Sequence, residues 1–172
     1  MKKLHSLASM LFALALPALV LFSAGCTGGE PLQNNGKAKE LTISQWVKGE
    51  PADVTDGEHI YVVEFWATWC GPCLQSIPHL TELQKKYKDQ GVLFIGVTAE
   101  KAEVVEPFVA EQGDKMDYIV ALDKNNATNK DYMTAHGQRG IPCAFLIDKE
   151  GYIVWIGHPM MLEAQLKQIL AQ

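Results

Sequence analysis

An apolar, β-branched run that leads almost directly into two cysteines is the feature that most constrains this chain. The run, HIYVVEFW at residues 59–66, has the composition of a buried central strand. The segment WCGPC follows at 69–73, and apolar residues then recur every three or four positions from 71 to 90, which predicts a helix. The fold must therefore place two thiols where a buried strand gives way to a helix.

The rest of the chain alternates between short strands and helices. Further strands are expected at 92–97, 118–122, 144–147 and 152–156, and further helices at 103–112, 127–135 and 161–170. Residues 148–151, DKEG, have the composition of a tight turn, which predicts a hairpin between the last two strands. The order βαβαβαββα predicts an α/β sandwich, with a mostly parallel central sheet, one antiparallel hairpin and helices on both faces.

The spacing of Cys70 and Cys73 predicts a dithiol with redox chemistry. Residues three positions apart share one face of a helix, close enough to form a small disulfide ring. The first thiol lies at the helix N-terminus, where unpaired N–H groups and the helix dipole favour an anion, so its pKa should fall. Pro72 lacks an N–H and suits the first turn. We expect Cys70 to be the nucleophile and Cys73 the resolving thiol.

The first 25 residues have the pattern of an export signal. Lys2 and Lys3 supply a positive start, and 11–22 is an unbroken apolar stretch. Small residues at 23–25 precede Cys26, as a signal peptidase requires. This ending resembles the lipobox of bacterial lipoproteins, which implies that Cys26 is lipidated, although Ser23 stands where that motif usually has Leu. Ordinary cleavage beside Cys26 and an uncleaved anchor are the alternatives; all three place the rest of the chain outside the cytoplasm.

Residues 26–40 are expected to form a flexible tether, and 41–172 a single domain. The tether sequence after Cys26, TGGEPLQNNGKAKE, shows no apolar periodicity and contains helix-disfavouring Gly and Pro. The 172-residue chain carries 15 Lys and Arg against 20 Asp and Glu, for a net charge of −5. Without a basic excess or a basic block, nothing in the sequence favours a nucleic-acid partner.

Three sequence features together resemble the thioredoxin superfamily. They are FWATWCGPC at 65–73, Pro78 within the following helix, and Gly-Ile-Pro at 140–142 before a strand. The export signal and the extra material between 97 and 140 resemble the membrane-tethered TlpA/ResA-type thiol–disulfide oxidoreductases. The resemblance spans roughly residues 41–172.

The resemblance implies a fold, a site and partners. Pro142 would be the cis-proline that faces the disulfide, and the substrate groove would be formed by Trp69, Gly71, Pro72 and Ile141. The implied activity is reduction of disulfides in exported proteins, with no cofactor and no metal. A membrane protein carrying electrons from the cytoplasm would reset the pair. Whether the substrate is apocytochrome c, another secreted protein or a small thiol stays open.

Glu64 is a further candidate for the site. Side chains alternate along a strand, so Glu64 shares a face with Val62 and Trp66 and should be buried, with a raised pKa. Thioredoxins have a buried aspartate at the matching position, which implies that Glu64 accepts the proton of Cys73. Related TlpA/ResA-type proteins often carry an acid where this chain has Ser76. The alternative is a structural carboxyl bonded to a neighbour such as Lys101.

Other functions compete with disulfide reduction. A thiol-dependent peroxidase of the alkyl hydroperoxide reductase/thiol-specific antioxidant type shares the fold, but its reactive cysteine follows a Thr by three positions, whereas Thr68 is two before Cys70. A tethered binding module without redox chemistry is a third class, which the intact cysteine pair disfavours. A zinc site is a further alternative for the cysteines, completed by Cys143 and one of His59, His79, His136 or His158; it lacks a second close ligand pair.

Cys143 directly follows the expected cis-proline. We expect it to be a buried, unreactive thiol, because free cysteine is among the most buried residue types. The alternative is a third redox thiol that reacts with the active-site pair or with a substrate.

Overall fold

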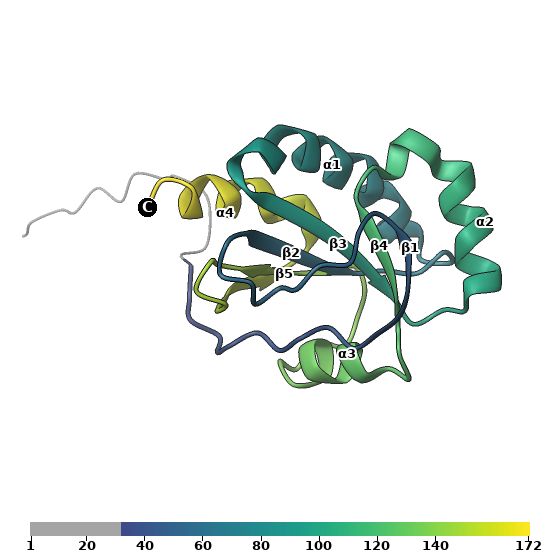
Figure 1. Cartoon of the computed structure of the whole chain (residues 1–172), viewed down its shortest axis with the longest axis horizontal. Coiled ribbons are helices and arrows are strands. Elements are labelled where there is room, and N and C mark those ends of the chain that lie inside the picture. The colour runs from purple at the N-terminus through teal and green to yellow at the C-terminus, as the bar shows by residue number, and fades with distance from the viewer. Residues whose placement is uncertain (1–31) are drawn as a thin grey trace, which may run out of the picture.

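A six-stranded sheet runs through the centre of the protein, whose computed structural model describes residues 32–172 (Figure 1). The strands are β1 (Ile43–Lys48), β2 (Ile60–Phe65), β3 (Val92–Thr98), β4 (Ile119–Asp123), β5 (Cys143–Ile147) and β6 (Ile153–Gly157). The helices are α1 (Gly71–Tyr87), α2 (Ala102–Gln112), α3 (Ala127–Asn129), which continues as a π-helical turn over Lys130–Thr134, and α4 (Leu162–Ile169). The order across the sheet is β1-β4-β3-β2-β5-β6.

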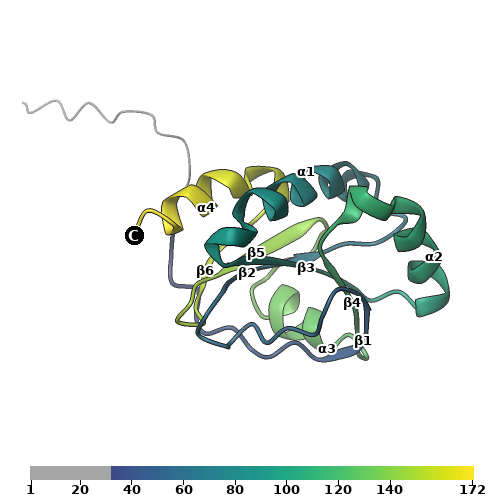
Figure 2. The same cartoon turned by 45° about the horizontal axis from the view of Figure 1, so that its top comes forward.

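Helices cover both faces of the sheet. Figures 1 and 2 show α1, α2 and α4 on one face and α3 on the other. Buried residues of α1, α2 and α4 pack against Val62 and Val120. Tyr132 and Met133, in the turn that continues α3, pack against Val63 and Phe145 on the opposite side. The α/β sandwich with helices on both faces, predicted from the strand and helix periodicities, is confirmed.

The sheet is more mixed than the predicted mostly parallel arrangement. β3 pairs in parallel with β2 and β4, but the pairings β1–β4, β2–β5 and β5–β6 are antiparallel. β1 was not predicted because its residues, ISQWVK, include none that is fully buried, so the strand carries no continuous apolar run. Strand direction at β5 depends on the path of the preceding connection, which composition does not reveal.

The folded domain begins earlier than the predicted residue 41. Backbone N–H groups of Gln33, Asn35 and Ala38 donate to carbonyls of residues 154, 153 and 151, at 2.8, 2.8 and 2.9 Å. This segment therefore lies along the β6 edge, and the prediction of a flexible tether over 26–40 is wrong for 33–38. Backbone hydrogen bonding of this kind leaves no apolar periodicity in the sequence, and it covers an otherwise open sheet edge.

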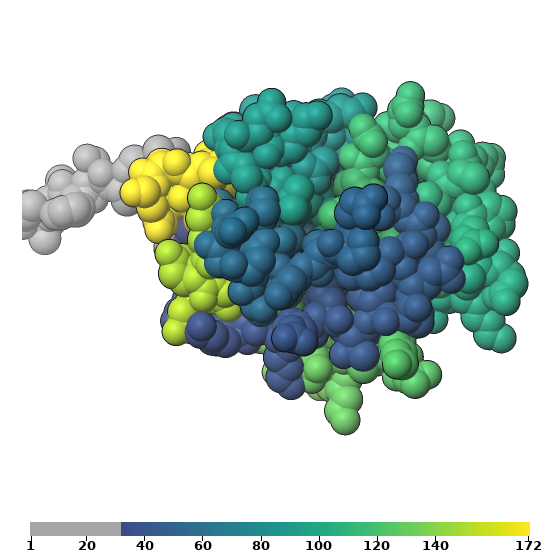
Figure 3. Space-filling view, in the orientation of Figure 1, coloured from purple at the N-terminus to yellow at the C-terminus, as the bar shows by residue number. Residues whose placement is uncertain are grey.

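In Figure 3 the polypeptide that precedes β2 spreads across one face of the molecule, between the C-terminal helix and α2. The predicted export signal, Cys26 and the remainder of the tether lie outside the described residues. Within residues 32–172, no helix has both the length and the apolar character needed to cross a bilayer.

A buried glutamine fastens α1 to the sheet. The β3–β4 ladder starts only at Ile95, which leaves the first residues of β3 without partners on that side. The Gln84 amide fills the gap: its Nε2 donates to the Val92 carbonyl at 3.0 Å, and its Oε1 accepts from the Phe94 N–H at 2.8 Å. Buried backbone groups left unpaired are costly, so these two bonds help to hold α1 in its position over β2 and β3.

Candidate active site

The two cysteines lie where β2 ends and α1 begins. Cys70 is the N-cap of α1, and its sulfur accepts the N–H of Cys73 at 3.3 Å. Pro72 occupies the first turn, as predicted. The two sulfurs form a disulfide, with Cα atoms 5.2 Å apart. The strand-to-helix junction thus brings the two thiols together as the sequence spacing predicts.

Both cysteines of the pair are buried. Cys70 is 4% exposed and Cys73 is 0% exposed, so neither is openly presented to solvent. The Cys70 sulfur lies 3.7 Å from the carbonyl oxygen of Ile141, at the margin of the site. Of the two residues, only Cys70 keeps any exposed surface.

The Ile141–Pro142 peptide bond is cis, as the resemblance implied, and it lies beside the disulfide. Trp69, which precedes Cys70, is 74% exposed. Trp69 and Ile141 both line two hollows, one of about 350 Å³ and one of about 360 Å³. Gly71 and Pro72 are exposed at the start of α1. The four residues expected to form a groove therefore lie around the disulfide on the molecular surface.

Glu64 is buried at 2% exposure on the sheet face that carries α1. Its Oε2 atom has no hydrogen-bond partner among the described residues, so the expected alternative of a bond to Lys101 is wrong for this oxygen. Burial raises the pKa of Glu64 to about 8, as the strand alternation predicted. A carboxyl group with this pKa is mostly neutral at pH 7 and ionises as the pH rises through about 8.

The surroundings of Glu64 are polar but unpaired. The indole Nε1 of Trp66 and the hydroxyl of Tyr118 are also buried without partners in the described part of the chain. Gly96 pairs with Glu64 across β2 and β3, and a Cβ at that glycine would lie 3.1 Å from both Trp66 Nε1 and the Tyr118 ring. Glycine at 96 therefore leaves room for the two aromatic side chains beside the buried carboxyl.

Cys143, the first residue of β5, is a free thiol that is 4% exposed. Burial, together with the nearby charge of Glu64, raises the pKa of this thiol to about 12. A thiol with so high a pKa holds almost no thiolate at neutral pH and is a poor nucleophile. The expectation that Cys143 is buried is confirmed.

No metal centre forms in the part of the chain that the structure covers. Within residues 32–172 no three His, Cys, Asp or Glu side chains cluster as metal ligands would, so the zinc alternative for the cysteines finds no support. Two of the histidines have structural contacts instead: His59 Nδ1 lies 2.7 Å from the Asp56 carboxylate, and His136 Nδ1 lies 2.8 Å from the Tyr132 carbonyl oxygen.

Sequence reasoning missed Glu100, which contacts the loop that carries the cysteines. Both carboxylate oxygens accept hydrogen bonds from Thr68, one from its backbone N–H at 2.6 Å and one from its hydroxyl at 2.8 Å. The two residues are 32 positions apart, and no motif joins them. Only the parallel pairing of β2 and β3, which ends both strands at the same edge, brings them into contact.

The sequence of this chain is similar to those of known proteins. The family model described as Redoxin matches residues 33–170. The chain belongs to the redoxin family. This redoxin is 31% identical to the thiol-disulfide oxidoreductase ResA of Bacillus anthracis, over 98% of its own length and 99% of that protein. The ResA of Bacillus subtilis is 26% identical over 85% of this chain and 79% of its own.

Solved structures agree with the sequence relatives. The redoxin resembles the crystal structure of a thiol:disulfide interchange protein DsbE from Chlorobium tepidum, with a TM-score of 0.68 and 28% identity over 81% of this chain and 99% of that one. The expected thioredoxin-like fold and TlpA/ResA-type relationship are confirmed. Together with the Cys70–Cys73 pair, they make this redoxin a thiol–disulfide oxidoreductase.

The raised pKa of Glu64 predicts how stability depends on pH. Between about pH 4.5 and 8 the folded state keeps a proton on Glu64 that the unfolded state releases, so stability should fall as the pH rises, by up to about 1.4 kcal/mol per pH unit. Glu64→Gln removes this dependence. Urea unfolding of the oxidised protein at pH 5 and pH 8 should show the variant gaining several kcal/mol relative to the parent at the higher pH.

The control is Glu150→Gln, which removes an exposed carboxylate at the β5–β6 turn. Its difference in stability from the parent should be nearly the same at both pH values. A constant difference for Glu64→Gln as well would show that the buried carboxyl is ionised throughout this range.

Proposed function

We propose that this redoxin reduces disulfides of exported polypeptides outside the cytoplasm, through the Cys70–Cys73 pair. The observation that carries the proposal is the asymmetry of the pair at the start of α1. Cys70 occupies the N-cap position of α1 and keeps a small exposed surface beside Ile141, whereas Cys73 is fully enclosed. One sulfur can meet a substrate while the other can meet only its neighbour.

The reaction proceeds by two thiol–disulfide exchanges. The Cys70 thiolate attacks one sulfur of the substrate disulfide, forming a mixed disulfide and releasing the first substrate thiolate. The Cys73 thiolate then attacks the Cys70 sulfur and displaces the second substrate thiolate. The substrate gains two electrons and takes up two protons, and the Cys70–Cys73 disulfide is left behind.

The N-terminus of α1 assists the first exchange. The Cys73 N–H points at the Cys70 sulfur, and the helix dipole adds partial positive charge at the same place. A thiolate at Cys70 is therefore stabilised relative to a thiolate in solution. Pro142 and Ile141 border the same sulfur and would align an extended substrate segment beside it.

Glu64 serves the second exchange as a general base. Cys73 is fully buried in a cluster that includes Val62 and Trp66. Glu64 lies between these two residues in β2, so its side chain is on the same face of the sheet. Cys73 has no exposed surface through which water could take its proton. Ser76, the other nearby candidate position, donates its hydroxyl to the Pro72 carbonyl and carries no carboxylate. The raised pKa of Glu64 suits it to accept a proton from a thiol near neutral pH.

The N-terminal sequence supports an extracytoplasmic location. Lys2, Lys3 and the apolar stretch at 11–22 have the pattern of an export signal, and Cys26 stands where lipoproteins are lipidated. Outside the cytoplasm the oxidised pair needs a supply of electrons, which the family resemblance assigns to a membrane protein. Substrates and electron donor would then meet the same face of this domain in turn.

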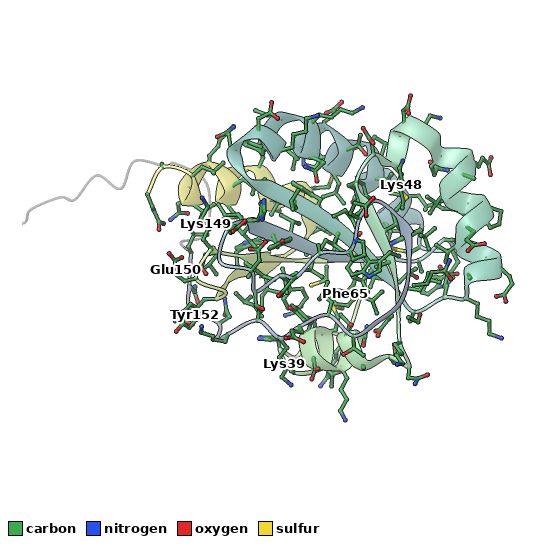
Figure 4. All side chains as sticks on the ribbon, viewed as in Figure 1. Lys39, Lys48, Phe65, Lys149, Glu150 and Tyr152 are labelled. Atoms are coloured by element: carbon green, nitrogen blue, oxygen red, sulfur yellow. A yellow bond between two sulfur atoms is a disulfide. The ribbon has the colours of Figure 1, made fainter. Side chains whose placement is uncertain are left out.

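The place where the N-terminal segment joins the domain determines which end of the domain would face a membrane anchor. Leu32 and Gln33 lie beside Ile60, at the start of β2, and near Lys149 and Glu150 in the β5–β6 turn. In Figure 4 that turn lies at the end of the sheet away from Phe65, after which the active-site loop begins. An anchor at Cys26 would therefore attach to the end of the domain opposite the disulfide and leave the disulfide facing away from the membrane.

Cysteine substitutions test the assigned roles. Cys70→Ser should abolish reduction of insulin disulfides, because no other accessible thiol can attack. Cys73→Ser should keep the first exchange and accumulate mixed disulfides, visible as thiol-sensitive adducts on non-reducing gels. Cys143→Ser is the matched control and should stay within a few-fold of the parent. Adducts with neither variant, or faster turnover of hydrogen peroxide than of insulin, would refute the reductase mechanism.

Glu64→Gln tests the general base. We expect resolution of the mixed disulfide to slow by about tenfold or more, and to lose the rise between pH 6 and 8 that follows ionisation of Glu64. The first attack by Cys70 should be nearly unchanged, and Glu150→Gln should resolve at the parental rate. Stopped-flow measurements that find equal resolution rates in parent and Glu64→Gln would leave the carboxyl without a role in proton transfer.

Lipidation of Cys26 has its own test. Expressed from its full gene in a bacterial host, the protein should partition into detergent and carry diacylglycerol on its N-terminal peptide by mass spectrometry. Cys26→Ala should give an unprocessed or detergent-excluded form. The same membrane behaviour and the same mass change in parent and variant would favour an uncleaved anchor or ordinary cleavage instead.

A further inference from the structure

The loop that carries Cys70 is held by a side chain from the neighbouring strand connection. Backbone bonding between β2 and the end of β3 stops at Trp66, whose N–H donates to the Val97 carbonyl at 3.2 Å. Two residues further along, Thr68 donates both its backbone N–H and its hydroxyl to Glu100, at 2.6 and 2.8 Å. Glu100 thus extends the cross-link between the two chain segments past the point where the sheet ends.

We propose that Glu100 is a positioning residue of the redox site, which fixes the Thr68–Cys70 loop with its two oxygens and disfavours the Cys70 thiolate with its charge. The inference rests on the proposed role of Cys70 as the nucleophile. It assigns Glu100 two separable effects, one geometric and one electrostatic.

The geometric effect follows from how few other contacts the loop has. Trp69 is 74% exposed and packs little against the domain. Cys70 donates its N–H to the Ala67 carbonyl at 3.1 Å, which closes a tight turn around Thr68 and Trp69. Between Ala67 and Cys70, the described hydrogen bonds that Thr68 and Trp69 make to the rest of the domain are those from Thr68 to Glu100. Loss of the carboxylate would free the turn and with it the direction of the Cys70 sulfur.

The electrostatic effect follows from the charges around the carboxylate. Glu100 borders the 350 Å³ hollow beside Trp69, and the residues that line this hollow include no Lys, Arg or His. The other carboxylate there, Asp123, accepts the N–H groups of Thr128 and Asn129 at 3.0 and 2.8 Å. Lys101, next in sequence to Glu100, is exposed to solvent. Glu100 also lines a second hollow, which Lys101 and Lys124 border. The charge of Glu100 therefore acts toward Cys70 from the Trp69 side, where the lining holds no cation.

A negative charge near Cys70 opposes the stabilisation that the helix N-terminus gives to its thiolate. Dithiol pairs whose thiolate is strongly stabilised are strong oxidants, because their reduced form is favoured. A pair with a less stabilised thiolate is therefore a better reductant. Glu100 would thus bias the pair toward reduction of substrates. Glu64, the other acid, is buried in β2 and serves the second sulfur in the proposed mechanism.

Two substitutions separate the two effects. Glu100→Gln keeps the contacts, since its amide oxygen can accept the Thr68 N–H and its amide nitrogen can donate to the Thr68 hydroxyl oxygen, but it removes the charge. Glu100→Ala removes both contacts and charge. Glu103→Gln is the matched control, because Glu103 is an exposed carboxylate in the first turn of α2. Thr68→Val removes the hydroxyl contact alone and serves if Glu100→Ala fails to fold.

The experiment measures insulin reduction and the pKa of Cys70, the latter from the pH dependence of alkylation by iodoacetamide. Glu100→Ala should lower kcat by about tenfold, as expected for a misplaced reacting group, and Glu100→Gln should restore it to within about threefold. Both variants should lower the pKa of Cys70 by roughly half a unit to one unit. Thr68→Val should lower kcat with the pKa of Cys70 unchanged, and Glu103→Gln should change neither.

Parental kcat in Glu100→Ala, or in Thr68→Val where the alanine variant does not fold, would overturn the positioning role. A Cys70 pKa in Glu100→Gln equal to that in Glu103→Gln would overturn the electrostatic role. If the parent itself fails to reduce insulin, the proposed function fails, yet alkylation still compares the Cys70 pKa among these proteins. The two hypotheses can therefore fail independently.

Discussion

The position of β2 in the sheet is the constraint on which the site depends. β2 is paired on both sides over almost its whole length, in parallel with β3 and antiparallel with β5, and all six of its residues are buried. At its last residue, Phe65, the partners are Val97 and Cys143. The cysteine loop, the Glu100 connection and the cis-proline therefore all emerge at one edge of the sheet, although they lie far apart in the sequence.

The same strand carries a carboxyl group into the core. Glu64 has two paired neighbours in the sheet and helices above it, and its Oε2 lacks a partner among the described residues. An unpaired buried carboxyl reduces the stability of the fold once it ionises. A loss of stability of this kind is typical of a functional position, because an apolar side chain at the same place would pack without it. Ionisation of Glu64 at alkaline pH thus lowers stability at the place where the proposed chemistry needs a base.

Two acids and a helix terminus define the electrostatics of the disulfide. The start of α1 favours a thiolate at Cys70, Glu100 is proposed to oppose it from the loop side, and Glu64 is buried in β2 on the sheet face that α1 covers. In the proposed mechanism the helix terminus favours attack on a substrate, Glu100 increases the readiness to give up electrons, and Glu64 assists release of the product.

The sequence by itself determined most of the helices and strands and the position of the two cysteines. The apolar run of β2, the spacing of Cys70 and Cys73 and the helix periodicity after them are local patterns, and hydrophobic burial with helix geometry turns each into one structure. The burial of Glu64 followed in the same way from strand alternation. Only the tertiary structure decided the direction of β5, the existence of β1, the seating of residues 33–38 along β6 and the contact between Glu100 and Thr68. Each of these depends on backbone pairing or on contacts between distant residues, which carry no periodic signal in the chain.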